Sequence, residues 1–169
     1  MAECAQRGIV RVRVSAETPW EMHNVRRLER LLGRLMRTIG LDRRLELSVL
    51  LVGDERIREL NSMYLGRDET TDVLAFPQLE ETEPGSIEKM KPAYPEPLGD
   101  IVICLPVAIK QAEESGVTEK DEIDLLAVHG LLHLLGFDDE TDEGADRIHA
   151  MEAGLLGRSS FKKRRRSNG

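Results

Sequence analysis

The sequence predicts an α+β fold, in which a small mixed four-stranded sheet packs with about five helices. Two observations predict this class. Short strand-like patterns interleave with amphipathic helical patterns along the chain, as in folds that layer helices on a sheet. In addition, one helical segment, residues 118–135, is apolar on almost every side. A helix of that kind is expected in the middle of the fold.

Four segments have strand patterns. The first alternates apolar and polar residues, as a half-buried strand does, and the others are short runs rich in Val, Ile and Leu. Pro77 is expected to stop the third strand, since proline cannot donate to a sheet ladder. The predicted strands are residues 9–14, 45–52, 72–76 and 99–105.

The helices are predicted from apolar residues at helical spacing and from their end signals. Asp54 is expected to cap the second helix and Thr118 the fourth. Pro106 should lie in the first turn of the third helix, and Gly136 should end the fourth. The predicted helices are residues 20–39, 54–64, 106–116, 118–135 and 143–156.

The 169 residues fit a single domain, which we place at residues 1–157. Within it, the proline-rich and acidic segment 78–97 is expected to be a mobile loop. Residues 158–169 hold six bases and no acid, which predicts a disordered tail that could touch phosphate. Without that tail, 18 bases face 31 acids, so residues 1–157 carry a charge of −13.

The composition also bears on location and partners. No apolar run approaches the roughly 20 residues needed to span a bilayer, and residues 1–8 lack the apolar stretch of a secretory signal. Cys4 and Cys104 form no disulfide framework, so both are expected to be reduced thiols in a cytoplasmic protein. An acidic body is not typical of a nucleic-acid-binding protein, and neither DNA nor membrane is expected as a partner.

A candidate metal site lies at the end of the apolar helix. His129 and His133 are four residues apart, which places both imidazoles on one face of the helix. Gly136 then lets the chain turn back, and Asp139 follows six residues after His133. This spacing indicates an open three-ligand site for one divalent ion, with zinc as the expected metal. Asp138 competes with Asp139 as the carboxylate ligand.

Two further residues bear on what the candidate metal site could do. A zinc peptidase has a glutamate directly after the first histidine as its general base, and here that position is Gly130. This disfavours peptide hydrolysis. His149, in the last predicted helix, is expected to be a satisfied or exposed histidine rather than a ligand.

These residues resemble a known family, the YbeY-type rRNA maturation factors. Residues 129–140, from His129 to Glu140, are similar to the family signature. Two further blocks match in order: Arg58 to Asn61 with Tyr64, Arg67 and residues 71–77, and then residues 98–103. The likeness covers about residues 45 to 156 and is highly specific.

The resemblance implies a metal-dependent endoribonuclease that cleaves single-stranded RNA in rRNA processing and ribosome quality control. A metal-activated water or hydroxide would attack the phosphodiester, and Arg58 would clamp a phosphate. Ribosomal RNA is the expected partner, and ribosomal proteins could deliver it. Two alternatives stay open: a ribosome-assembly binding protein whose metal is purely structural, and a metalloprotease-like hydrolase.

Three positions depart from the family pattern. The third ligand is usually histidine, and here it is Asp139. Two histidines and a carboxylate also bind non-haem iron, so the identity of the metal is less secure. Leu65 stands where a basic residue is usual, and Ala75 where serine is common.

Overall fold

The structure is a computed structural model that describes residues 11–80 and 83–158. Its sheet has four strands in the order β1-β2-β4-β3, so the α+β class and the mixed sheet are confirmed. The strands β1, β2 and β4 run parallel to one another, and β3 is antiparallel to β4. Their bounds are β1 Arg11–Ala16, β2 Leu45–Val52, β3 Val73–Pro77 and β4 Glu96–Cys104.

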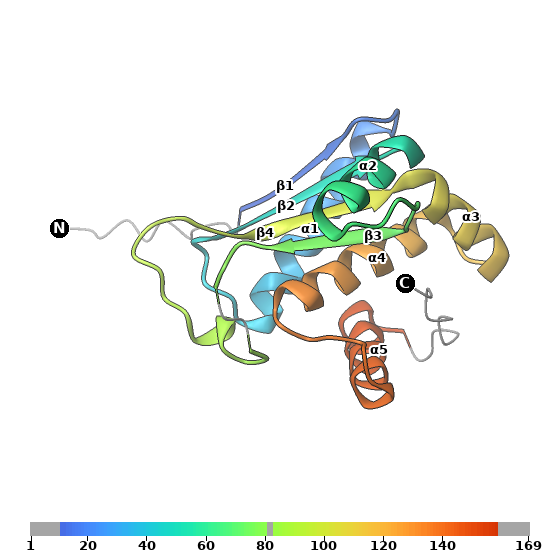
Figure 1. Cartoon of the computed structure of the whole chain (residues 1–169). Helices are drawn as coiled ribbons and strands as arrows, with labels where there is room; N and C mark the ends of the chain where they lie inside the picture. The colour runs from blue at the N-terminus through green and yellow to red at the C-terminus, as the bar shows by residue number, and fades with distance from the viewer. Residues whose placement is uncertain (1–10, 81–82, 159–169) are drawn as a thin grey trace.

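Five α-helices accompany the sheet in the described ranges. In Figure 1, α1 and α4 cover one face of the sheet, α2 covers the other, and α5 lies against α4 on the side away from the sheet. The helices are α1 Met22–Ile39, α2 Asp54–Leu65, α3 Leu105–Ser115, α4 Glu119–Leu134 and α5 Asp142–Leu156.

Side chains along the central strands point alternately to the two faces of the sheet, so each face has its own hydrophobic core. On β4, Ile101 and Ile103 point into the larger core, which α1 and α4 complete. Val102 and Cys104 point the other way, into a smaller core under α2. The helices α2 and α4 therefore pack on opposite faces of the sheet.

The helix α4 is buried on almost every side, as its apolar sequence predicts. It begins at a Thr118 cap, whose hydroxyl accepts a hydrogen bond from the Asp121 N–H at 3.1 Å. Its side chains pack against α3, β3, β4 and α5. The position of Gly130 shows how close this packing is, since a Cβ there would lie 2.8 Å from Cγ2 of Ile101.

One predicted helix cap was wrong, and one predicted loop ends earlier than expected. Asp54 does not cap α2, because Gly53 holds the cap position and the Asp54 carboxylate instead lies 3.2 Å from Sγ of Cys104. The segment 78–97, predicted as a loop, is not wholly irregular. It contains a 3₁₀ turn, η1 Ile87–Lys89, anchored by the buried Ile87, and its last residues already belong to β4.

Several other features bear on the predictions. Cys104 is a free, buried thiol whose pKa burial raises to about 12. Cys4 and most of the predicted tail lie outside the described residues. Arg158, which begins that tail, is described and forms an ion pair with Asp121.

Within the described ranges, no helix has both the length and the apolar character needed to cross a membrane.

Candidate metal site

The two histidines point to the same place from consecutive turns of α4. Nε2 of His129 lies 2.9 Å from Nε2 of His133. Both rings are mostly buried, with 16% and 27% of their side chains exposed. Burial and the neighbouring His129 lower the pKa of His133, which favours the neutral ring that a metal ion requires.

The chain beyond α4 turns back because of a glycine and two local anchors. Gly136 has a φ of +94°, a conformation that other residues rarely adopt. The N–H of Phe137 then donates to the Leu132 carbonyl at 3.1 Å, and the Phe137 ring packs under the guanidinium of Arg147. Thr141 closes the turn by capping α5 through the N–H of Gly144.

This turn brings Asp139 to the histidines. Its Oδ2 lies 3.8 Å from Nε2 of His129, and its Oδ1 lies 3.9 Å from Nε2 of His133. One ligand atom from each of the three residues lies within 4.8 Å of the others, so the group could hold a metal ion. Ligands of a tetrahedral zinc ion are about 3.3 Å apart, which is close to these separations.

Asp138, the rival carboxylate, has a different partner. It is exposed, and its Oδ1 accepts a hydrogen bond from the N–H of Glu140 at 3.2 Å. Of the two neighbouring aspartates, Asp139 is thus the one that the structure brings into the group with the imidazoles.

A fourth residue, Glu152 of α5, completes the surroundings of the site. Its Oε1 lies 2.7 Å from Nδ1 of His129, and its side chain is only 3% exposed. A carboxylate can only accept from the imidazole, so Nδ1 carries the proton and Nε2 presents its lone pair to His133 and Asp139. Paired in this way, His129 is oriented as a metal ligand, and the donor set fits a divalent ion.

Comparison with known proteins agrees with this geometry. The family model described as Endoribonuclease YbeY matches residues 15–160. The chain belongs to the YbeY endoribonuclease family.

Individual YbeY proteins are similar over most of the chain. The Endoribonuclease YbeY of Bacillus cytotoxicus is 39% identical over 79% of this chain and 85% of its own length. That of Salinispora tropica is 45% identical over 70% of this chain and 76% of its own. A Thermotoga maritima protein of known solution structure matches with a TM-score of 0.56 and 26% identity, over 86% of this chain and 89% of its own.

Arg58, the residue that likeness to the YbeY family singles out, lies on α2 and makes a two-pronged ion pair. Its Nε and Nη2 donate to the two carboxylate oxygens of Asp68 at 2.7 Å and 3.0 Å. The pair is exposed, and the guanidinium lowers the pKa of Asp68. Since α2 and α4 pack on opposite faces of the sheet, Arg58 lies on a different helix from the histidines and on the other side of the sheet.

Glu152 was not predicted, although its sequence position carries a signal. It shares one face of α5 with Ile148, which is buried, and with Leu155, and an acid on the apolar face of a helix needs a buried partner. His149 was expected to be satisfied or exposed. It is partly exposed, and its Nδ1 lies 3.7 Å from Oε2 of Glu152.

Proposed function

We propose that this protein is a metal-dependent endoribonuclease that hydrolyses single-stranded RNA during rRNA maturation and ribosome quality control. One divalent ion, with zinc as the expected metal, would be held by His129, His133 and Asp139. The observation that carries the proposal is the convergence of these three side chains beside the buried Glu152, in a chain of the YbeY family.

The exposure of the three side chains supports a catalytic site rather than a sealed structural one. About half of the Asp139 side chain is exposed, and His133 is exposed by about a quarter, whereas Glu152 is buried. The site is therefore open on the Asp139 side, where a strand of RNA can approach. When bound, a divalent ion supplies Lewis acidity and lowers the pKa of water toward about 7.

Arg58 is proposed to bind a phosphate of the substrate. Its guanidinium already makes a bidentate contact with the Asp68 carboxylate, and phosphate presents the same geometry. A phosphate would have to replace Asp68 as the partner. Substituting Arg58→Ala should therefore weaken RNA cleavage while leaving the metal content unchanged, and Arg56→Ala, on the same helix, is the matched control.

Gly130 argues against a metalloprotease. The structure gives this position no room for a side chain, because even a Cβ would contact Ile101 of β4 at 2.8 Å. A glutamate base could stand there only if α4 moved away from the sheet. Phosphodiester hydrolysis would not need a base at that position, since an ion held by His129, His133 and Asp139 would make water more acidic and the RNA 2′-hydroxyl could also serve as the nucleophile.

The remaining partners follow from this proposal. RNA is the expected substrate, ribosomal proteins could deliver it, and we expect the protein to act in the cytoplasm and not on DNA. Comparing cleavage of a single-stranded RNA with that of a DNA of the same sequence tests the last point.

Chelation separates a catalytic ion from a structural one. Melting temperature and single-stranded RNA cleavage are followed separately as a chelator removes the metal, and zinc, manganese or iron is then restored. We expect cleavage to be lost while the fold persists, and to return with the native metal. A large fall in melting temperature, with no cleavage at any metal load, would support the ribosome-assembly protein with a structural metal instead.

A further inference from the structure

Among the helices that the structure describes, α1 is the one in which bases outnumber acids. The α1 segment carries five arginines, no lysine and a single acid, Glu29. That acid accepts a hydrogen bond from the N–H of Val14 at 3.0 Å. Several arginines on other elements are paired with carboxylates, as Arg11 is with Glu46 and Arg44 with Asp42. The outer face of α1 is thus a local basic surface.

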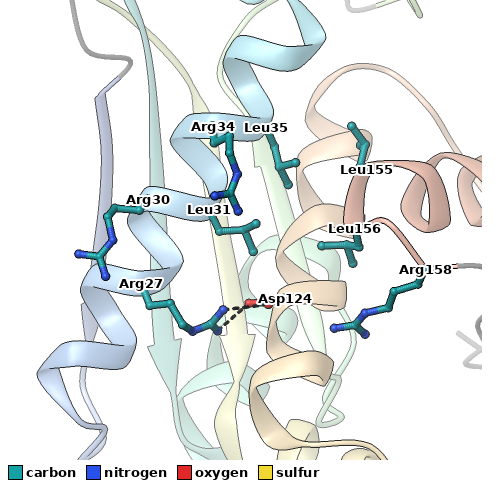
Figure 2. A pocket seen from close by; sticks show the side chains of 9 residues that line it. All are labelled: Arg27, Arg30, Leu31, Arg34, Leu35, Asp124, Leu155, Leu156 and Arg158. Carbon is teal, nitrogen blue, oxygen red and sulfur yellow. Dashed lines mark hydrogen bonds and ion pairs between the residues drawn. The ribbon is translucent and has the colours of Figure 1, made fainter.

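A pocket of about 280 Å³ opens between this helix, α4 and α5. Figure 2 shows the guanidinium groups of Arg27, Arg34 and Arg158 turned toward it, while that of Arg30 points away. Leucines form its apolar walls. The complete lining is Arg27, Arg30, Leu31, Arg34, Leu35, Asp124, Leu155, Leu156 and Arg158.

Asp124, the carboxylate of the lining, is already neutralised. Arg27 donates to both of its oxygens, at 2.7 Å and 2.9 Å. Arg158 is likewise engaged by Asp121. Arg34 is exposed and makes no side-chain ion pair in the part of the chain that the structure describes. The pocket therefore keeps a net positive charge, supplied by Arg34.

The pocket and the metal site are built on the same two helices, α4 and α5. On α5, Leu155 and Leu156 lie about one turn beyond Glu152, a rise of about 5–6 Å. On α4, Asp124 precedes His129 by five residues, or about 7.5 Å along the axis. Five residues also turn about 140° around a helix, so Asp124 and His129 face different sides of α4. An RNA strand several nucleotides long would be needed to reach both the pocket and the histidines.

We propose that this pocket binds a backbone phosphate of the RNA strand whose cleaved bond lies at the metal site. The proposal rests on the proposed function and adds a second contact to it. Arginine is suited to phosphate because its planar guanidinium can make two parallel hydrogen bonds. The chain's own last residues are not the expected ligand, since 159–169 contain five bases and no acidic side chain.

Arg34→Ala tests the proposal, with Arg26→Ala as the matched control. Both residues are exposed arginines of α1, and only Arg34 lines the pocket. Binding of a single-stranded RNA, kept intact by 2′-O-methyl groups, is measured by anisotropy over a series of salt concentrations. We expect Arg34→Ala to weaken binding about five- to tenfold and to reduce the salt slope by about 0.7, the value for one lost phosphate contact on a single strand.

The control should show a smaller loss of affinity and the wild-type salt slope. Arg34→Lys should recover part of the affinity, since it restores the charge without the two-pronged contact. Equal effects of Arg34→Ala and Arg26→Ala would overturn the proposal. So would an unchanged RNA affinity accompanied by weaker binding of a poly-glutamate peptide, which would assign the pocket to an acidic protein segment.

One further measurement distinguishes RNA phosphate from free phosphate as the ligand, and another distinguishes failure of the pocket proposal from failure of the proposed function. If inorganic phosphate displaces the labelled RNA only at concentrations far above those at which unlabelled RNA does, the pocket binds phosphate as part of an RNA strand. Competition at equal concentrations would overturn it in favour of free phosphate. A wild-type protein that binds RNA through Arg34 but never cleaves it would contradict the proposed function and leave the pocket proposal intact.

Discussion

Glu152 connects α5 to the metal site through one short contact. Its carboxylate holds the proton of His129 at Nδ1, so that Nε2 faces the other two ligands. It also supplies a buried negative charge beside two rings that have been largely removed from water. The site thus depends on a residue of α5 that would not itself touch the ion.

Replacing Glu152 should weaken metal binding without unfolding the protein. In Glu152→Gln, the amide keeps a similar shape but loses the charge that orients His129. We expect the affinity for zinc to fall by about 10- to 100-fold, measured by competition with a chromophoric chelator. Glu143→Gln, an exposed position on the same helix, is the control. Unchanged affinity in Glu152→Gln would show that the contact is only structural.

The lowered pKa of His133 gives a pH prediction for the metal-free protein. An unfolded histidine takes up a proton near pH 6.5, whereas burial and His129 keep the folded ring neutral to a lower pH. The unfolded state therefore binds the extra proton first, and stability should decrease as pH falls below about 6.5. Above that pH, this histidine should contribute no pH dependence.

Urea unfolding at pH 7.5, 6.5 and 5.5 measures this effect. We expect His133→Asn to lose stability less steeply than wild type over this range. His23→Asn, at an exposed histidine next to Glu21, is the matched control. Parallel pH profiles for wild type and His133→Asn would show that the folded ring titrates normally.

At the scale of elements, α4 combines ligand spacing with close packing on the sheet. The same helix presents His129 and His133 on one side and Gly130 to Ile101 on another. The absence of a side chain at Gly130 lets the helix approach β4. Gly130 therefore has a role in packing. The same close packing leaves no room there for the glutamate base of a peptidase.

Gly130→Ala should destabilise the protein although alanine favours helices. The new Cβ would lie 2.8 Å from the Ile101 side chain, and such overpacking costs about 1–3 kcal/mol. Gly154→Ala on α5 is the matched control, because a Cβ there meets nothing within 4 Å. It should stabilise by up to about 1 kcal/mol. Urea denaturation that ranks the two variants in the opposite order would contradict this packing.

The elements also show what could be read from the sequence. The helix α4 was predictable because its residues are apolar on all sides and Thr118 is a good cap. The cap of α2 was not, because Gly53 takes that position and Asp54 instead meets Cys104 from a strand 50 residues away. Contacts of that kind depend on tertiary packing, which local patterns do not contain.

At the scale of the molecule, the fold class and the grouping of Asp139 with the two histidines were predicted, whereas the contact with Glu152 was not. His129 and His133 are neighbours by helical geometry alone. The choice of Asp139 over Asp138 depends on how the turn after Gly136 is anchored, and the contact with Glu152 depends on how α5 docks on α4. The arginines of α1 are visible in the sequence, but the pocket beside them forms only where α1, α4 and α5 meet.

The most direct measurement is metal content per chain coupled to single-stranded RNA cleavage, for Asp139→Ala beside Asp138→Ala. Asp139 faces both imidazoles, whereas Asp138 turns back to the N–H of Glu140. We predict that Asp139→Ala loses most of its metal and its cleavage while keeping a native circular dichroism spectrum, and that Asp138→Ala keeps both. Full metal content and undiminished cleavage in Asp139→Ala would contradict the account.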